Sequence, residues 1–442
     1  MPQTITESDY IYFLKHLTVF KPKMKLALKT TLLLFSAFYL VPFFASGFGV
    51  LSHEAIVDAE WDHSILPLLK AKFPSASIEE QNEAHAYAYG GAVAPDMGYY
   101  PLGSKLFTNL VHYVRSGDMV DALLRDARNI NEYAFALGFL SHYVADDYGH
   151  PLATNRSVPL VYPRLRKKYG NVITYGDNKV SHLRMEFGFD VLEVAKGHYA
   201  SQAYRNFIGF KVDTAVLSKA FFETYGLTID EVFSHHFHLG VETFRWIVAN
   251  IFPVITREAW ATKKHQILKQ YNTANSKNFK FKMRRRQYNK QFGKDYKRPG
   301  FSAKMLSFFL RVIPKIGPLR ALKFKPPTPQ SEVFFDRSFD TILLHYSSRI
   351  KRLPQDHEPL RDIDFDTGLP TANCEYQLAD QTYVAWLLRL NGDEFKNTNA
   401  SIQKNIIRFF HLPAVAGSHS TLSKKCIRFM EAYHEIVKLD PQ

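Results

Sequence analysis

Two short runs of histidine and carboxylate residues place the tightest constraint on the fold of this chain. The first run is His142-Tyr-Val-Ala-Asp146-Asp-Tyr-Gly-His150, and the second is His182-Leu-Arg-Met-Glu186. At about 100° per residue, side chains four positions apart lie roughly 40° apart around an α-helix. Each run can therefore present imidazoles and carboxylates on one helical face, and two such helices can form opposing walls of one pocket. Taken singly, either run also fits an ordinary surface pair of helix residues.

The hydrophobic pattern predicts helices along most of the chain after residue 48. Apolar residues recur at i, i+3, i+4 spacing, and the long alternating patterns typical of strands are missing. The predicted helical stretches are 53–72, 78–91, 107–115, 119–127, 132–147, 181–195, 229–265, 377–390 and 401–410. Hydrophobic residues make up 46% of the composition and aromatic residues 14%, which is enough for a large core. We therefore expect an all-α fold, a multi-helix domain whose helices surround an internal site.

The positive charge of the chain is concentrated in one segment. The formal net charge is +14, but residues 277–325 hold 16 lysines and arginines against one acid, so the other residues sum to −1. The stretch 266–330 is therefore expected to be a basic linker or surface arm appended to the helical domain. Within it, residues 301–322 interleave apolar and basic side chains. This pattern fits peripheral contact with an anionic membrane surface, with a solvated linker or nucleic-acid contact as alternatives. Helical patterns return in 331–442, the expected C-terminal helical region.

The first 47 residues, 1–47, have the features of an export signal. Residues 24–29 supply a short basic region, 31–44 an apolar stretch, and Ala45-Ser46-Gly47 the small residues that precede a cleavage site. Cleavage would make Phe48 the first mature residue, and Met24 is a second candidate for the true start. We expect a periplasmic or secreted protein. The alternative is an uncleaved membrane anchor, although the apolar stretch is short for a span of about 20 residues.

Other groups of potential ligands fit metal chemistry less well. Three histidines within residues 235–238 cannot all face one centre on a helix, which favours packing or a solvated face. The acidic turn at 362–368 has neither the spacing nor the terminal glutamate of a calcium loop. With only Cys374 and Cys426 present, the chain has no disulfide framework and no thiolate zinc site, and whether these two cysteines pair stays open.

Three further candidate ligands lie upstream of the two runs. His53 follows Phe48 by five residues, Asp96 sits in a Pro-Asp-Met-Gly turn, and His112 falls on a short predicted helix. In this order the residues resemble the zinc-dependent phospholipase C family and, more distantly, the S1/P1-type nucleases that share its fold. The resemblance covers about residues 48–195. The matching positions are Phe48, His53, Asp96, His112, His142, Asp146, His150, His182 and Glu186.

The resemblance implies a helical domain, here 48–265, that binds up to three zinc ions. The resemblance also implies which residues bind each ion. One ion would be bound by Asp96, His112, His142 and Asp146, and another by the free amine and carbonyl of Phe48 together with His53 and Asp146. The last would be bound by His150, His182 and Glu186. The family usually places five residues between its aspartate and the next histidine, whereas three separate Asp146 from His150. Gly149 and Pro151 also indicate that the helix ends there, so Asp147 is an alternative ligand.

The chemistry implied by such a site is hydrolysis of a phosphate ester. Two cations that share a carboxylate lower the pKa of a water molecule, which can then attack phosphorus. Asp96 could orient that water or take its proton. The amine of Phe48 has a reference pKa of about 8 and could bind zinc only after the signal is cleaved.

We therefore expect an exported, zinc-dependent phosphodiester hydrolase, phospholipase C-like and acting on a phospholipid. A nuclease of the S1/P1 type is the alternative enzyme, and it would need aromatic platforms for the bases. A non-catalytic envelope protein that keeps the fold is the alternative outside the enzymes. Tyr99, Tyr100 and Tyr143 lie near the candidate ligands in sequence and could line a substrate pocket or pack in the core.

Overall fold

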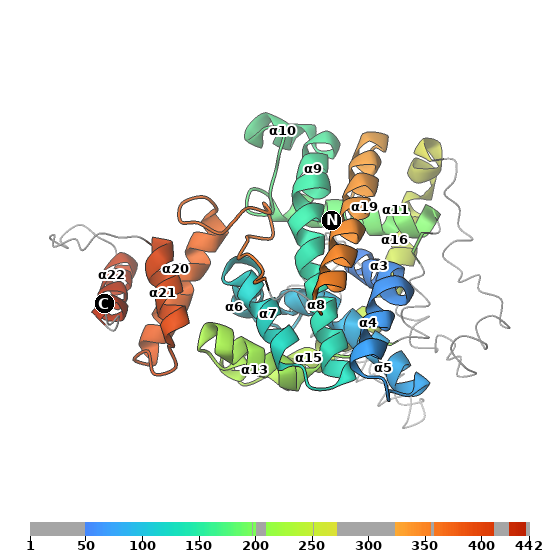
Figure 1. Ribbon diagram of the computed structural model, residues 1–442. Coiled ribbons are helices and arrows are strands. Elements are labelled where there is room, and N and C mark those ends of the chain that lie inside the picture. Colours follow the sequence, from blue (N-terminus) through green and yellow to red (C-terminus); the bar gives the residue numbers. More distant parts are fainter. Residues whose placement is uncertain are drawn as a thin grey trace, which may run out of the picture. The chain divides into compact units, whose positions relative to one another are not determined.

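The computed structural model describes residues 49–196, 198–199, 209–250, 252–271, 323–354, 358–410 and 424–438, all of which fall within one compact unit (Figure 1). In these ranges the regular elements are helices, and the only strand-like feature is an isolated antiparallel bridge between Ile363 and Pro370. The expected all-α fold is confirmed. No helix among the described residues is both long and apolar enough to cross a membrane. The expected export signal, Phe48 and most of the basic segment lie outside the described residues.

Two helices in close contact form the centre of the core. They are α5 (Ile78–Val93), which starts with a capping box between Ser77 and Glu80, and α8 (Ile130–Gly149), which Asn129 caps. A Cβ atom on Gly138 of α8 would lie 2.0 Å from the carbonyl oxygen of Ala88 in α5. Glycine at this position therefore permits the backbones to approach so closely. This contact sets how closely the backbones of α5 and α8 approach each other.

The chain does not stop at the end of α8 but continues through an irregular turn. As the sequence predicts, the α-helix ends at Gly149, and the five residues of η4 (His150–Thr154) form a π-helical turn that leads into α9 (Asn155–Val161). Pro151 lacks an N–H group and cannot continue the regular hydrogen-bond ladder. Single π-turns of this kind widen a helix locally and occur often at functional sites.

The other helices pack on this pair or on one another. In the N-terminal half they are α3 (Val50–Glu60), η2 (Trp61–Ile65), α4 (Leu66–Lys72), η3 (Ala94–Tyr99), α6 (Lys105–Tyr113), α7 (Ser116–Asp126), α10 (Pro163–Tyr169), α11 (Lys179–Lys196) and α13 (Thr214–Tyr225). They are followed by α14 (Ile229–Val232), α15 (Phe237–Asn250), α16 (Phe252–Gln270), α19 (Pro329–Arg352), α20 (Gln377–Gly392), α21 (Ala400–Phe410) and α22 (Lys424–Lys438).

The helical stretch predicted for 229–265 is interrupted after α14. Ser234 and His235 have positive φ angles of 52° and 62°, so the chain turns before α15 begins. The side chains of His235, His236 and His238 are all exposed. This arrangement agrees with a solvated face and gives these histidines no common centre.

Residues from the C-terminal half pack directly on the central helices. Helix α19 lies along α8 (Figure 1), and the Tyr346 hydroxyl donates a hydrogen bond of 2.8 Å to the carbonyl oxygen of Leu137. Helix α20 packs against α6. Because α19 packs on α8 and α20 packs on α6, the segment that joins α19 to α20 lies close to α8 and α6.

Candidate metal centre

Eight of the nine expected ligands converge inside the core. They come from six elements: His53 from α3, Asp96 from η3, His112 from α6, His142 and Asp146 from α8, His150 from η4, and His182 and Glu186 from α11. Each of these residues is at most 3% exposed. The ninth, Phe48, lies outside the described residues. The sequence runs that suggested the site are thus brought together with the three upstream candidates.

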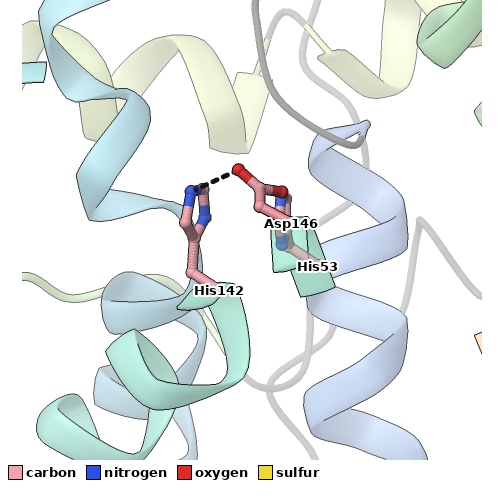
Figure 2. A group of neighbouring side chains, drawn as sticks. All are labelled: His53, His142 and Asp146. Carbon is pink, nitrogen blue, oxygen red and sulfur yellow. Dashed lines mark ion pairs between the residues drawn. The ribbon is translucent and has the colours of Figure 1, made fainter. Parts of the chain in front are cut away.

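Asp146 lies at the middle of the group and faces imidazoles with both of its oxygens. Oδ2 is 3.1 Å from Nε2 of His142 and 3.8 Å from Nε2 of His112, while Oδ1 is 3.6 Å from Nε2 of His53 and 3.7 Å from Nε2 of His150. Figure 2 shows His53 of α3 turned toward His142 and Asp146 of α8. Burial opposes ionisation of Asp146, but the facing imidazoles of His142 and His150 outweigh it and lower the pKa of the carboxyl group. Asp146 is therefore a carboxylate with the geometry to bridge two cations.

The donor atoms form three groups in which they lie within 4.8 Å of one another. The groups are His53, His142 and Asp146; Asp96, His112 and His142; and His150, His182 and Glu186. In the second group, Oδ1 of Asp96 is 3.3 Å from Nε2 of His112. In the third, Oε1 of Glu186 is 2.7 Å from Nε2 of His182 and 3.4 Å from Nε2 of His150. The third group has the same members as one of the ligand sets that the resemblance implies. In the other two, His142 is shared, and Asp146 is grouped with His53 and His142 rather than with Asp96 and His112.

The chemistry of these donors fits zinc. Both carboxylate oxygens of Asp96 and of Asp146, and Nε2 of His112 and His142, are buried without a hydrogen-bond partner within the described part of the chain. These buried groups face one another in histidine–carboxylate contacts, and a bound cation would satisfy their remaining capacity to bind. Nitrogen and oxygen donors in sets of three or four are the ligands that zinc uses.

Backbone carbonyls orient two of the imidazoles toward the centre. Nδ1 of His142 lies 2.8 Å from the carbonyl oxygen of Ala92, and Nδ1 of His112 lies 2.9 Å from that of Thr108. When Nδ1 donates its hydrogen to these carbonyls, the lone pair of Nε2 points into the site. Outer contacts of this kind select the tautomer that binds a metal.

The structure places His150, and not Asp147, with His182 and Glu186. The π-helical turn begins at His150 and directs its ring inward, so the short spacing from Asp146 does not remove it from the site. Asp147 is half-buried on the neighbouring face of α8, and burial raises its pKa to about 6. It belongs to none of the three donor groups found among the described residues.

One part of the site was not predicted, namely the turn 362–368 between α19 and α20. The backbone N–H of Phe365 donates to the carbonyl oxygen of His112 at 3.1 Å, and the Phe365 ring centroid lies 5.1 Å from that of His112 and 5.7 Å from that of His142. Oδ1 of Asp366 is 3.3 Å from Nδ1 of His150. The only feature of the sequence that marks this turn is its three alternating aspartates, and this pattern does not reveal which residues the turn contacts.

The tyrosines near the ligands are core residues in this conformation. Tyr99, Tyr100 and Tyr143 are at most 5% exposed. The Tyr99 ring centroid lies 6.1 Å from that of His112, and the Tyr143 hydroxyl donates to the carbonyl oxygen of Arg361 at 2.8 Å. They therefore pack around the site as core residues.

Comparison with known proteins points to the same chemistry. Residues 48–235 match the family model described as zinc dependent phospholipase C. No curated protein and no solved structure matches the chain. The matched segment contains all nine expected ligands and ends well before the turn 362–368.

Proposed function

We propose that this chain, whose residues 48–235 match the zinc-dependent phospholipase C family model, releases a phosphorylated headgroup from phospholipid. The observation that carries the proposal is the position of Asp146, whose Oδ1 lies 3.6 Å from Nε2 of His53 in one donor group and whose Oδ2 lies 3.8 Å from Nε2 of His112 in another. A carboxylate in that position can hold two cations close together, an arrangement suited to phosphodiester hydrolysis.

The three donor groups support a trinuclear zinc site. Divided as the family resemblance implies, one ion would be held by Asp96, His112, His142 and Asp146, a second by His53 and Asp146 with the backbone of Phe48, and a third by His150, His182 and Glu186. The distance of 3.8 Å from Oδ2 of Asp146 to Nε2 of His112 supports the place of Asp146 in the first set. When bound, zinc supplies the Lewis acidity that activates water for attack on phosphorus.

Asp96 is proposed to orient the attacking water and to accept its proton. Its carboxylate is fully buried, with Oδ1 3.3 Å from Nε2 of His112. Burial raises the pKa of Asp96 well above its usual value. The imidazole of His142 lowers this pKa, and the carboxylate of Asp146 raises it further. A buried carboxylate beside the attacking water can orient it and accept its proton.

The mature amino terminus at Phe48 is proposed to complete the second ion's ligands after export and cleavage. The start of α3 is firmly held, which supports this. Asp190 accepts hydrogen bonds from the backbone N–H groups of Leu51 and Ser52, both at 3.1 Å, and the carbonyl of Gly49 accepts from His53 at 3.1 Å. A variant that retains residues 24–47 is expected to have less zinc and low activity. Full zinc content and activity in that variant would refute this role for Phe48.

The basic segment 266–330 is proposed to hold the enzyme at anionic lipid surfaces. Its support is the concentration of charge, with 16 basic residues against one acid in 277–325. Association with vesicles should therefore weaken as salt concentration rises, because exposed charges are screened over about 10 Å at 0.1 M salt.

The direct test of the function presents two phosphodiesters to the mature protein. Phospholipid vesicles and single-stranded DNA are incubated with the wild type and with Asp146→Asn, and soluble phosphorylated headgroups and nucleotides are measured. Headgroup release by the wild type alone is the expected result. Release of nucleotides would support the S1/P1-type nuclease, and no release of either from a folded protein would support the non-catalytic alternative.

A further inference from the structure

The turn 362–368 lies in the C-terminal half of the chain, outside the family match, and yet it touches the zinc site. We propose that Asp366 in this turn is a positioning residue that holds the His150 imidazole so that its Nε2 atom faces the third metal ion. This inference rests on the proposed function and extends it, because it makes the C-terminal half part of the metal centre.

The two nitrogens of His150 have carboxylates on opposite sides. Oδ1 of Asp366 lies 3.3 Å from Nδ1, while Nε2 is 3.4 Å from Oε1 of Glu186 and 3.7 Å from Oδ1 of Asp146. A carboxylate beside Nδ1 favours the tautomer that carries its hydrogen there and leaves the Nε2 lone pair for a cation. Asp366 thus has the role for His150 that the Ala92 carbonyl has for His142.

The backbone around His150 explains why such support is needed. His150 opens a π-helical turn and is followed by Pro151, so the regular ladder of α8 does not continue through this position. A ring placed on a helix interior is fixed by the turns on both sides, whereas a ring at this junction depends more on its side-chain neighbours.

Asp366 is itself held by three residues from other parts of the chain. Its Oδ2 atom accepts hydrogen bonds from the hydroxyls of Tyr113, at 3.0 Å, and Tyr376. Its backbone carbonyl accepts from Nδ2 of Asn155 at 2.6 Å. The residue is 2% exposed. Since a buried carboxylate is stable only where donors or charges face it, these contacts fix both its ionised form and its direction.

The turn that carries Asp366 is also organised by its own residues. Oδ1 of Asp364 accepts the backbone N–H groups of Asp366 at 3.1 Å and Thr367 at 2.9 Å. Gly368 has a φ angle of +69°, and a Cβ atom there would lie 2.5 Å from the carbonyl oxygen of Asp147. The turn therefore has a defined conformation against the end of α8, as a positioning role requires.

The test compares two charge-removing substitutions in the same turn. Asp366→Asn removes the carboxylate beside His150. Asp362→Asn makes the same chemical change where the carboxylate faces the start of α7, with Oδ1 accepting the N–H groups of Gly117 and Asp118. Zinc content and affinity are measured by elemental analysis and by titration in zinc buffers. We expect the zinc site of His150, His182 and Glu186 to lose about 10–100-fold in affinity in Asp366→Asn, a range typical of outer contacts, and to be unchanged in Asp362→Asn.

A milder variant keeps the proposal testable if Asp366→Asn does not fold. Tyr376→Phe leaves the carboxylate in place and removes one of its donors, and a smaller weakening of the same zinc site is expected. If a folded variant of this pair binds zinc at every site as tightly as the wild type does, the role of Asp366 is overturned and the proposed function stands. A wild-type protein without zinc would overturn the proposed function and this role together.

Discussion

The imidazole rings of His53 and His142 stack with their centroids 4.3 Å apart and their planes inclined by 15°. Burial lowers the pKa of His53 well below its usual value, and the neighbouring His142 lowers it further. Since a protonated imidazole cannot bind a metal, this environment keeps His53 in the neutral form that a zinc ligand requires. The pairing also brings α3 and α8 together at the site.

Replacing the central carboxylate should remove two of the three metal ions. In Asp146→Asn we expect zinc content to fall from near three to about one ion per chain, because the side chain lies between His53 of one donor group and His112 of another. Headgroup release should fall by at least about 10²-fold. Asp147→Asn is the matched control, since its half-buried side chain lies outside all three groups. Equal zinc content in the two variants would contradict the bridging role.

Removing zinc should destabilise the folded protein. Ligand present at about 1,000 times its Kd adds roughly 4 kcal/mol to stability, which for a large domain corresponds to at least about 5 °C in Tm. Thermal unfolding followed by circular dichroism should show such a decrease after chelation and a recovery when zinc is added back. Asp146→Asn should show a smaller change, and an identical change in both proteins would count against this explanation.

The close contact between α5 and α8 should be sensitive to a single methyl group. Gly138→Ala places a Cβ atom against the carbonyl of Ala88, so we expect a loss of about 1–3 kcal/mol in the free energy of unfolding. Gly392→Ala is the control, because its Cβ would meet nothing within 4 Å. Denaturant unfolding of the two variants measures the difference. Equal stability would show that the helices can separate without cost.

A buried histidine away from the metal site should contribute to acid sensitivity. His85 stacks on Trp61 with ring centroids 3.7 Å apart, and burial lowers its pKa to about 3, although Asp58 lies 3.8 Å from its Nε2 atom. The unfolded chain binds a proton at this residue below about pH 6.5 and the folded chain does not, so stability falls as pH falls. Between pH 7 and pH 5 this loss amounts to about 2 kcal/mol.

The comparison that isolates this effect is His85→Phe, which keeps an aromatic ring beside Trp61 but cannot titrate. Denaturant unfolding is measured at both pH values in the same zinc buffer. The wild type should lose about 2 kcal/mol more than the variant on acidification. Parallel changes in the two proteins would mean that His85 is protonated in the folded state.

Local sequence patterns predicted most of the helices and the ligand order. Spacing of four residues was sufficient for His142 with Asp146 and for His182 with Glu186, since one helix carries each pair. The break at Ser234 and His235 was missed because apolar periodicity continues across it. The export signal, the amine of Phe48 and the function of the basic segment stay predictions.

Contacts between distant segments could not be predicted in the same way. Asp366 reaches His150 because α19 lies along α8 and α20 lies against α6, and this packing leaves no periodic trace in the turn that joins them. Asp190 reaches the start of α3 from α11 for a similar reason. Residues that orient ligands are therefore harder to recognise than the ligands, whose chemistry restricts them to a few residue types.

Elemental analysis of the folded, mature wild-type protein tests the central claim most directly. Eight buried donor side chains in three groups predict close to three zinc ions per chain after purification in zinc-containing buffer. A folded protein that retains one zinc ion or none would contradict the assignment of this cluster as a hydrolytic metal centre.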